Sequence, residues 1–511
     1  MLPANALPAY VTTPGGFLLV LAIILPVVAV LAMLVLDPRH ARSVVGATIL
    51  AGVAAALAIA EELIRTGAAL IYVVGGWQPP LGLALRADGL SATMIAMTAI
   101  VLPGIAIFAR GLQDLKPETR NGRAPTTFWS LLMGVWSALC LTFIGQDLFN
   151  LYVALELLTF AAVPLVCLDG RSETMGAALR YLMFALLGSM LYLLGTGLFY
   201  GAFGTLDIRS LSAMSDDRPA VSVALALMIA GLLAKAALFP LHLWLPPAHA
   251  GAPAAASAVL SALVIKAPIF LTLRLVAEVA PTPMAAIAGK ILAILGAFAI
   301  ILCSVMALRQ ARLKLMIAYS TVAQIGYLFI VFPLATGADA LPPWGTIAWT
   351  GGALQLGSHA LAKASMFMAA GIIAEAFGHD NIRDLSGFGR ILPLSAATFG
   401  LAGLSLMGLP PSGGFIAKCL LLTSAVLGGH PWLSTTILAG GLLAAGYVFR
   451  VMNRALATPQ TPLIIRRKIP ARLEVVPLIL ALLAVLLGFV PLEPLGLLQI
   501  GRPDRPAETM P

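Results

Sequence analysis

The sequence predicts an all-α, polytopic membrane protein with about fourteen transmembrane helices. Of its 511 residues, 60% are hydrophobic and only 10% are charged, which leaves too few polar side chains to cover a water-soluble globule of this size. Apolar runs of about 20 residues, the length of a membrane-spanning helix, recur along the whole chain. Two of these runs carry prolines and glycines at mid-length, a pattern typical of broken helices in transporters.

The expected helices are apolar runs bounded by proline, glycine and charged clusters. We place them at 15–36, 43–64, 88–109, 126–145, 147–168, 176–201, 222–247, 253–274, 285–306, 313–335, 345–377, 392–424, 433–454 and 471–492. The breaks between them are about twenty residues or shorter, so we expect one membrane domain over 1–511. The run at 15–36 is longer than a signal-peptide core and follows no Lys or Arg, which indicates a retained helix.

The seventh and twelfth segments are expected to be broken. Pro240 removes a backbone N–H inside 222–247, and Pro410 and Pro411 interrupt 392–424 among several glycines. A simple proline kink without function is the alternative. Backbone unwound at membrane depth is tolerated where it lines a cavity or is buried in protein, and paired broken helices point to a transport site.

The two breaks are five helices apart, which predicts an inverted repeat. A unit of five helices re-enters the membrane with opposite orientation. We therefore expect a first repeat over 126–274, formed by the fourth to eighth segments, and a second over 285–454, formed by the ninth to thirteenth.

Orientation follows from the positions of Lys and Arg. The loops after the odd-numbered segments hold nineteen of these residues, and the other loops with the C-terminal tail hold seven. By the positive-inside rule the odd-numbered loops are cytoplasmic. We expect a multi-pass protein of a bacterial or archaeal cytoplasmic (inner) membrane, with both termini on the outer side.

Five charged residues lie in the middle of apolar stretches: Glu156, Lys235, Lys266, Lys363 and Lys418. A charge in the middle of a bilayer is costly, faces a polar interior and marks an ion or proton path. Lys235 and Lys266 each lie about thirteen residues into their segment, roughly 20 Å along the axis, and cannot reach water by stretching. These positions therefore predict a proton relay.

Glu156 and Lys235 form the natural pair within this set. A structural salt bridge that only fixes helix packing is the alternative interpretation. The surplus of lysines favours the relay, because four cations share one central carboxylate and a buried lysine exchanges its proton readily. Opening the pair would raise the proton affinity of the carboxylate and lower that of the amine, and so would drive a proton onward.

Histidines are further candidates. His359 and Lys363 are four residues apart and share a helix face, which suits proton transfer through one water molecule. His242 would lie on the same side as Lys235 if the helix stayed regular past Pro240. A neutral histidine bonded to a backbone carbonyl is the alternative for each.

Three other titratable residues lie toward segment ends. We expect His249 to be interfacial. Glu375 and Asp380 lie near the cytoplasmic end of 345–377, where a solvated exit or a contact with a partner is equally expected.

Composition also argues against several classes of function. The net charge of +9 comes from residues scattered over short loops, without a basic patch interleaved with aromatics, so we expect no nucleic-acid binding and assign the surplus to topology. The four cysteines form no CxxC pair and have no histidine cluster at metal-ligand spacing. We therefore expect no cofactor, no metal and no catalytic redox site in this chain.

These stretches resemble a known family. LYVALELLTFAAVPLV with Glu156, LLAKAALFPLHLWLPPAHAGAP with Lys235, SALVIKAPIF with Lys266, SHALAKASMF with Lys363 and GLPPSGGFIAKCLL with Lys418 are similar to motifs of the antiporter-like subunits of respiratory complex I, membrane-bound hydrogenases and Mrp cation/proton antiporters. The resemblance covers roughly residues 70 to 455. It implies a fourteen-helix subunit whose relay runs from the Glu–Lys pair to the terminal lysine.

Within the family, the stretch GGWQPPLGLALRADGLSA, the length and Lys418 resemble the D-type subunit of Mrp antiporters. The resemblance implies proton transport coupled to sodium or potassium, with other membrane subunits as partners and the lipid bilayer as surroundings. A proton-pumping subunit of an NADH-quinone oxidoreductase or a hydrogenase is the alternative, so the sequence leaves open whether the complex is a redox enzyme. A non-pumping membrane scaffold is a third alternative.

Overall fold

The computed structural model describes residues 9–115, 123–335, 343–459, 463–490 and 493–502. Within them, twelve continuous helices are long and apolar enough to cross a membrane. They are α1 Phe17–Val35, α2 Ala41–Thr66, α3 Gly89–Asp114, α4 Arg123–Ile144, α5 Leu148–Val166, α6 Ser172–Phe203, the composite helix Ala254–Val279, α12 Thr282–Arg309, α13 Leu313–Ala335, α14 Pro343–Phe377, α18 Pro431–Leu456 and α19 Ala471–Leu486.

Two further crossings are broken, as predicted. In the seventh, α8 (Pro219–Lys235) ends before the non-helical residues 236–244, and α9 (Leu245–Gly251) follows. In the twelfth, α16 (Pro393–Met407) is separated from α17 (Gly413–Leu427) by residues 408–412. Pro240, Pro410 and Pro411 lie inside these gaps. The twelve continuous helices and these two broken crossings match the fourteen predicted segments in order and position.

The structure adds small elements that the sequence did not reveal. Strands β1 (Leu70–Val73) and β2 (Ala84–Ala87) form an antiparallel hairpin in a stretch expected to be a loop. Strands of four residues are too short to show a period beside long apolar helices. The remaining short helices are α7 Ile208–Met214, α15 Phe388–Ile391 and the 3-10 turns Pro38–His40, Val74–Gly76, Ile382–Asp384, Leu487–Phe489 and Glu493–Gln499.

The eighth crossing changes its helix type along its length. It runs from α10 (Ala254–Val259) through a π-helical turn at Leu260–Val264 into α11 (Lys266–Arg274), and ends in a second π-helical turn at Leu275–Val279. No residue type marks a π turn in a sequence, so an unbroken helix was the expectation. Such turns are frequent at functional sites, and the first of the two is separated from Lys266 by a single residue.

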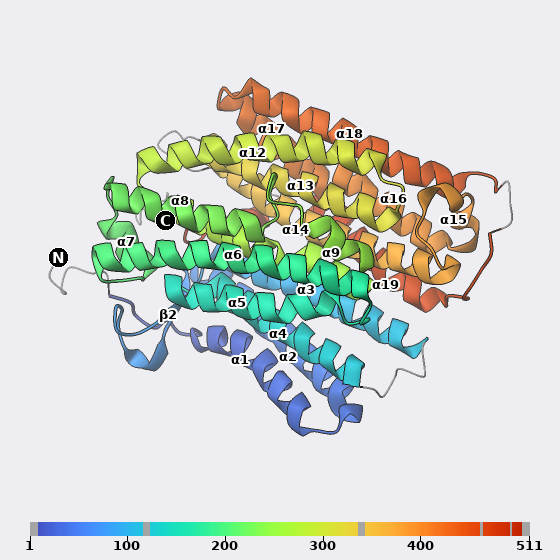
Figure 1. Cartoon of the computed structure of the whole chain (residues 1–511). Coiled ribbons are helices and arrows are strands. Elements are labelled where there is room, and N and C mark those ends of the chain that lie inside the picture. Colours follow the sequence, from blue (N-terminus) through green and yellow to red (C-terminus); the bar gives the residue numbers. More distant parts are fainter. Residues whose placement is uncertain (1–8, 116–122, 336–342, 460–462, 491–492, 503–511) are drawn as a thin grey trace.

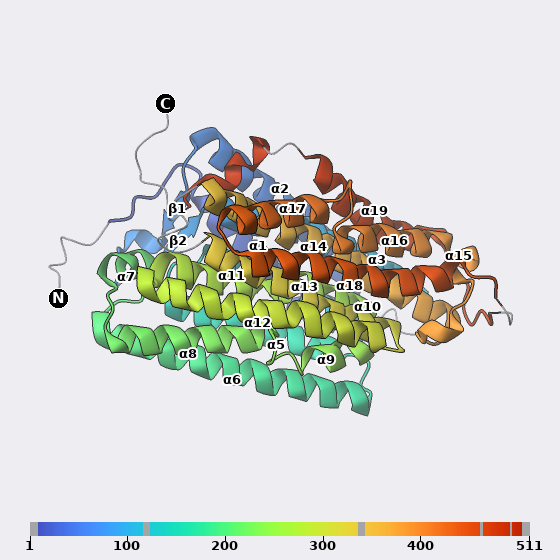
Figure 2. The same ribbon diagram turned by 90° about the horizontal axis from the view of Figure 1, so that it is seen from above.

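The centre and the periphery of the bundle differ in burial. The buried share of the most apolar stretch is 94% in the composite helix Ala254–Val279 and 89% in both α13 and α14. In α1 it is only 28%. Figures 1 and 2 show α14 surrounded by other helices, with α1 and α2 along one flank and α6 and α8 along another. The charged residues of interest lie on or against the central helices.

The first and last described residues lie at the same end of the bundle as the β-hairpin. The Tyr10 amide donates to Gln78, and Arg86 of β2 donates to the carbonyl of Gly501. Figure 1 places β2 and α7 at this end and α15 at the opposite end. An even number of membrane crossings requires this arrangement.

Candidate functional site

The five predicted charges all lie inside the bundle. Lys266 and Lys363 are completely buried, Lys235 and Lys418 are 7% and 6% exposed, and the Glu156 side chain is 14% exposed. They come from α5, α8, α11, α14 and α17. The structure therefore places four lysines and one glutamate where an unpaired charge is costly, and their contacts decide what they can do.

Glu156 and Lys235 are paired. The Lys235 Nζ lies 3.3 Å from Glu156 Oε1 and donates a hydrogen bond of 2.9 Å to the Thr159 hydroxyl. The Ser189 hydroxyl of α6 donates to the same Glu156 oxygen. The carboxylate and the ammonium thus each have two hydrogen-bond partners. A buried ion pair needs such additional hydrogen bonds to offset the cost of desolvation.

A close helix contact brings Lys235 to this place. The backbones of α6 and α8 meet at Gly188 and Gly231, where a Cβ on Gly231 would lie 2.2 Å from the Gly188 carbonyl oxygen. Because only glycine permits this approach, α8 can deliver its last residue, Lys235, to α5 across α6. Lys235 is also the C-terminal residue of α8, where the helix dipole stabilises a positive charge.

Lys266 and Lys363 belong to one connected polar network. Lys266 Nζ donates to the Ser261 carbonyl at 3.2 Å, and the Ser261 hydroxyl lies 3.0 Å from the Thr321 hydroxyl of α13. Thr321 in turn donates to the Ile317 carbonyl at 2.9 Å, which also accepts from Lys363 Nζ at 3.2 Å. The two ammonium groups are therefore joined through α13.

Serine and threonine side chains supply most of this network, and the sequence did not reveal them. Ser320 also contacts Lys363, as a hydrogen-bond acceptor. Ser261, Ser320 and Thr321 are all completely buried. Their spacing around Lys266 and along 313–335 is the signal that could have revealed them, because hydroxyl groups facing a buried lysine are rare in an otherwise apolar helix.

Lys418 contacts the end of the first half of its broken crossing. Its Nζ donates to the Leu406 carbonyl at 2.5 Å and lies 4.4 Å from the centre of the Tyr327 ring. The Leu406 carbonyl also accepts from the Gln324 amide at 3.1 Å, and Gln355 donates to Gln324 at 3.1 Å. The break exposes a helix-end carbonyl that would otherwise be bonded within the helix.

His359 lies between these two groups. It is 1% exposed, and neither ring nitrogen has a hydrogen-bond partner among the described residues. Lys266, Lys363 and Lys418 are all close enough to act on its ring electrostatically. The ring is therefore a buried titratable group on which three of the four lysines act.

Two of the weaker candidates have other surroundings than predicted. His242 lies in the unwound stretch 236–244, so the assumed regular helix past Pro240 is absent, and its ring packs 5.4 Å from that of Phe239. Glu375 forms an ion pair with Arg467, which follows α18. Glu375 thus ties α14 to the 463–470 stretch at the end of the bundle opposite the β-hairpin.

The expectation for His249 was wrong. The residue is 0% exposed, because α9 packs between α6 and α13 and keeps its end inside the protein. Its ring stacks on Phe367 of α14 with 4.4 Å between centroids, and neither nitrogen has a partner in the part of the chain that the structure describes. Lys314 and Lys363 both act on the ring electrostatically. His249 therefore joins the candidate residues.

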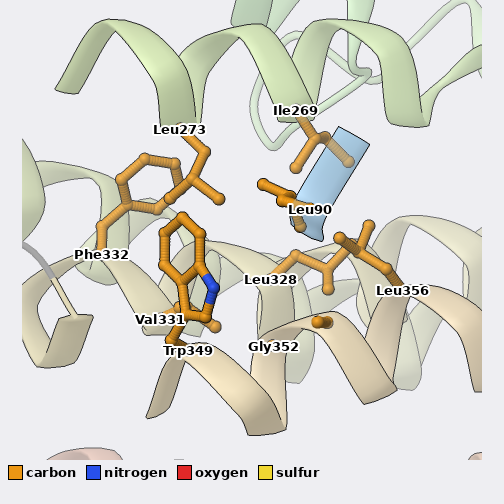
Figure 3. Close-up of a pocket in the computed structure, with 10 residues that line it drawn as sticks. Leu90, Ile269, Leu273, Leu328, Val331, Phe332, Trp349, Gly352 and Leu356 are labelled. Carbon is orange, nitrogen blue, oxygen red and sulfur yellow. The ribbon is translucent and has the colours of Figure 1, made fainter. Parts of the chain in front are cut away.

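An apolar region adjoins the network toward the β-hairpin end. Figure 3 shows Leu90, Ile269, Leu328, Trp349 and Leu356 around a cavity of about 20 Å³. A space of this size and apolar lining has no polar partners for water and stays dry. Ile269 is three residues beyond Lys266 in the same helix, so this apolar pocket lies about one helical turn from that lysine.

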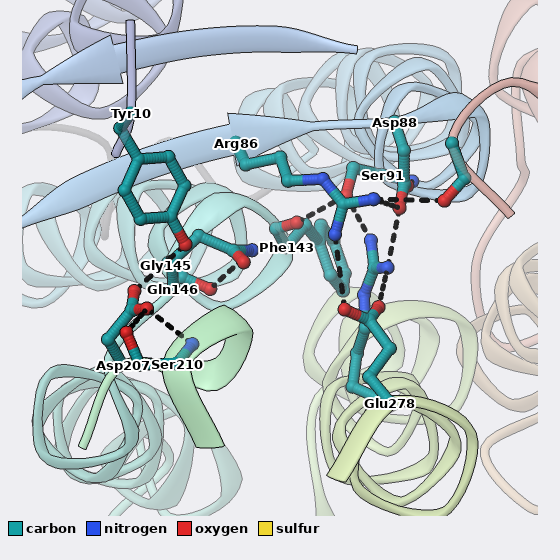
Figure 4. Close-up of polar contacts among 12 residues, drawn as sticks. Tyr10, Arg86, Asp88, Ser91, Phe143, Gly145, Gln146, Asp207, Ser210 and Glu278 are labelled. Atoms are coloured by element: carbon teal, nitrogen blue, oxygen red, sulfur yellow. Dashed lines mark hydrogen bonds and ion pairs between the residues drawn. The ribbon is translucent and has the colours of Figure 1, made fainter. Parts of the chain in front are cut away.

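A group of four charges closes the same end. Arg274 donates to Asp88 and Glu278, and Arg86 bonds Glu278 at 3.1 Å (Figure 4). All four side chains are at most 17% exposed, and their formal charges cancel. Burial raises the proton affinity of Asp88, but Arg274 and Arg86 outweigh it and hold the pKa of this carboxyl below its usual range. The sequence did not reveal this cluster.

Comparison with known proteins assigns the chain to a family. Residues 145–444 match the family described as NADH:quinone oxidoreductase/Mrp antiporter, transmembrane. The chain is 36% identical over 446 residues to the N-type subunit of NADH-quinone oxidoreductase from Desulforudis audaxviator, a match covering 85% of this chain and 86% of that protein. It is 25% identical over 434 residues to the D-type subunit of the Na(+)/H(+) antiporter from Alkalihalophilus pseudofirmus, covering 83% and 84%.

A solved structure has the same fold. A chain of the membrane-bound sulfane sulfur reductase, an archaeal respiratory membrane complex, matches with a TM-score of 0.84 and 26% identity, over 96% of this chain and 97% of that chain. The residues matched by the family model include every buried lysine described above. The chain therefore belongs to the NADH:quinone oxidoreductase/Mrp antiporter family and is an antiporter-like, multi-pass membrane subunit.

Proposed function

We propose that this chain translocates protons along its buried charges as one subunit of a multisubunit membrane complex. The path runs from the Glu156–Lys235 pair through Lys266, Lys363 and His359 to Lys418. The observation that carries the proposal is the hydrogen-bonded connection between Lys266 and Lys363, because a purely structural role for each lysine requires no shared network.

The pair acts as an electrostatic switch in this proposal. While Glu156 and Lys235 are in contact, each stabilises the charged form of the other. Separation of the two raises the proton affinity of the carboxylate and lowers that of the ammonium, which then releases its proton toward Lys266. Because Lys235 ends α8 beside the unwound residues 236–244, a movement of this joint would change its distance to Glu156 without shifting the whole helix.

The apolar pocket and the ion cluster make transfer along the bundle more favourable than leakage straight across. Lys266 Nζ donates to the Ser261 carbonyl and the Ser261 hydroxyl contacts Thr321, whereas the pocket beside Ile269 offers no polar partner toward the β-hairpin end. Because backbone carbonyls accept but do not pass on a proton, water molecules between the lysines and the hydroxyl groups complete the proposed path. The proton would pass His359, whose free nitrogens can accept and donate, before it reaches Lys418.

We assign the complex to the Mrp type of monovalent cation/proton antiport, with sodium or potassium as the exchanged cation. The stretch from Gly75 to Ala92 and the relative named as the D-type component of a Na(+)/H(+) antiporter support this assignment. The second candidate is a proton-pumping subunit of a redox complex, favoured by the higher identity to the NADH-quinone oxidoreductase relative. Proton movement that depends on added sodium or potassium supports the first, and movement that depends on an electron donor supports the second.

The same proposal places the chain in the cytoplasmic membrane of a bacterial or archaeal cell. The end of the bundle that carries α15 and Arg467 faces the cytoplasm, because most loop Lys and Arg residues lie at that end. Both termini then lie on the outer side.

Proton uptake by vesicles that carry the assembled complex tests the proposal. Glu156→Gln and Lys235→Ala should each lower the rate about 100-fold, the size of a lost proton-transfer group. Lys290→Ala is the matched control, because Lys290 is an exposed lysine in the third turn of α12, outside the buried network. If both variants assemble and retain the rate of the control, the chain is a non-pumping scaffold and the relay is wrong.

A further inference from the structure

A polar pocket lies far from the relay, at the end of the bundle opposite the β-hairpin. It has a volume of about 270 Å³ and lies between the turn that joins α1 to α2 and the first turns of α4. Arg39 and Arg42 line it from the turn, and Thr126 and Trp129 line it from α4, together with two prolines. Neither the family motifs nor the proposed transport path uses any of these residues.

The cationic groups of the pocket retain unused donors. Arg42 donates to Asp114 at 2.8 Å and to Gln113 at 3.3 Å, which fixes its guanidinium in place. Arg39 is three-quarters exposed, and its closest ion-pair contact, with Asp37, is 3.6 Å long. Asp37 instead accepts a 2.9 Å bond from the Arg39 backbone amide. The exposed Arg39 guanidinium contacts Asp37 only through Nε, so its terminal N–H groups can bind an oxyanion.

Trp129 supplies a further donor to the lining of the pocket. It is 3% exposed, and its Nε1–H has no acceptor among the described residues. A buried donor without an acceptor costs stability that an oxygen in the pocket would restore. The backbone at the start of α2 adds no free donor, because Asp37 accepts from the Arg39 and His40 amides and the Pro38 carbonyl accepts from the Ala41 amide.

The position of the pocket relative to the membrane identifies the anion. α1 ends at Val35 and α2 begins at Ala41, so the connecting turn lies at the level where the hydrocarbon core ends. Leu31, Leu34 and Val35 in the last turns of α1 are exposed and offer an apolar surface to acyl chains.

We propose that this pocket binds the phosphate group of an anionic phospholipid, with Arg39 as the main ligand, Arg42 and Trp129 as fixed neighbours and the acyl chains along the end of α1. A guanidinium and a phosphate form paired, charge-assisted hydrogen bonds, and basic pockets between helix ends are suited to lipid headgroups. Asp37 and Asp114 offset part of the positive charge, so the site depends on hydrogen-bond geometry and not on net charge alone.

Native mass spectrometry of the purified full-length chain, titrated with phosphatidylglycerol or phosphatidylcholine, tests this assignment. Arg39→Gln should weaken phosphatidylglycerol binding about tenfold, the size of one charge-assisted hydrogen bond. Arg65→Gln is the matched control, because Arg65 is an exposed, ion-paired arginine at the other end of α2. Trp129→Phe keeps the ring but removes the N–H, and should weaken binding by a smaller factor.

Three results would overturn the assignment. Equal affinities of the Arg39→Gln and Arg65→Gln variants would show that Arg39 is not a ligand. Equal affinity for the anionic and the zwitterionic lipid would show that the site does not select a net negative headgroup. Displacement of phosphatidylglycerol by millimolar inorganic phosphate would show that a soluble phosphate, and not a lipid, is the occupant. Exposure of Arg39 makes its substitution compatible with folding, so each result is interpretable.

Discussion

Lys266 and Lys363 lie on different membrane-crossing helices but share one series of hydrogen bonds. Ser261 takes part with both its carbonyl and its hydroxyl, Thr321 bridges to α13, and the Ile317 carbonyl accepts from Thr321 and from Lys363. The two lysines therefore lie within one set of polar contacts that passes through α13. These contacts need no movement of a helix, unlike the switch at Glu156 and Lys235.

Thr321→Val should weaken this connection while preserving side-chain volume. The loss of the hydroxyl removes the bond to Ser261 and the bond to Ile317 together. We expect proton flux to fall about tenfold, in the range of one or two hydrogen bonds. Flux into vesicles that carry the assembled complex is the measurement.

Thr98→Val is the control for that substitution. Thr98 is equally buried, in α3, and within the described part of the chain its hydroxyl bonds the Met94 carbonyl one turn earlier in the same helix. It should retain near-normal flux. A similar loss of flux in both variants would assign the effect to burial of threonine and not to the link between the lysines.

Gly231→Ala should disturb the delivery of Lys235. The added methyl group would lie 2.2 Å from the Gly188 carbonyl oxygen, so α6 and α8 must separate. Overpacking of this kind costs about 1–3 kcal/mol of stability. Thermal unfolding in detergent should show a lower midpoint, and proton flux should fall because Lys235 moves away from Glu156.

Gly197→Ala is the matched substitution, on α6 itself. A Cβ at Gly197 meets nothing within 4 Å, and alanine favours helix more than glycine does. Its unfolding midpoint should be unchanged or slightly higher. A Gly231→Ala protein as stable and active as Gly197→Ala would show that the close contact is not needed to position the pair.

Acid should selectively weaken the end of the bundle that carries the β-hairpin. The pKa of Asp88 is lowered in the folded protein, so its contribution to stability is complete above the unfolded value of about 4 and is lost as the pH falls through the lower folded value. The unfolding midpoint of the protein should therefore drop below about pH 4, and Asp88→Asn should lack part of this drop and be less stable at neutral pH.

Asp216→Asn provides the comparison for Asp88. Asp216 is half-exposed in an ion pair with Arg218, and such pairs contribute little to stability. Its substitution should leave the unfolding midpoint nearly unchanged, both at neutral pH and at acid pH. If Asp88→Asn behaves in the same way, the four-charge cluster does not stabilise this end.

The fold could be predicted from the sequence because membrane helices are determined by local properties. Long apolar runs have no alternative to helix in a bilayer, and Pro240, Pro410 and Pro411 mark the two places where the helix must stop. The same logic found Glu156 and the four lysines, since a charge stands out against an apolar run. Each of these features is visible within its own segment.

The remaining features depend on contacts between segments, which a sequence does not display. Ser261 and Thr321 are ordinary hydroxyl residues until the fold brings them together. His249 looked interfacial because it ends a segment, but α6 and α13 enclose it. Two other features belong to the backbone and are not visible in the side-chain sequence. They are the π turn before Lys266 and the Leu406 carbonyl that Lys418 contacts.

The most direct measurement of the central claim is proton flux through the assembled complex with Lys266→Ala. Lys266 is completely buried and connects to Lys363 through α13, so its loss should interrupt the path while the Glu156–Lys235 pair stays intact. The account predicts flux about 100-fold below that of the exposed control Lys290→Ala, at equal amounts of complex. Flux equal to that of the control, in a complex that assembles fully, would contradict proton transfer along the buried lysines.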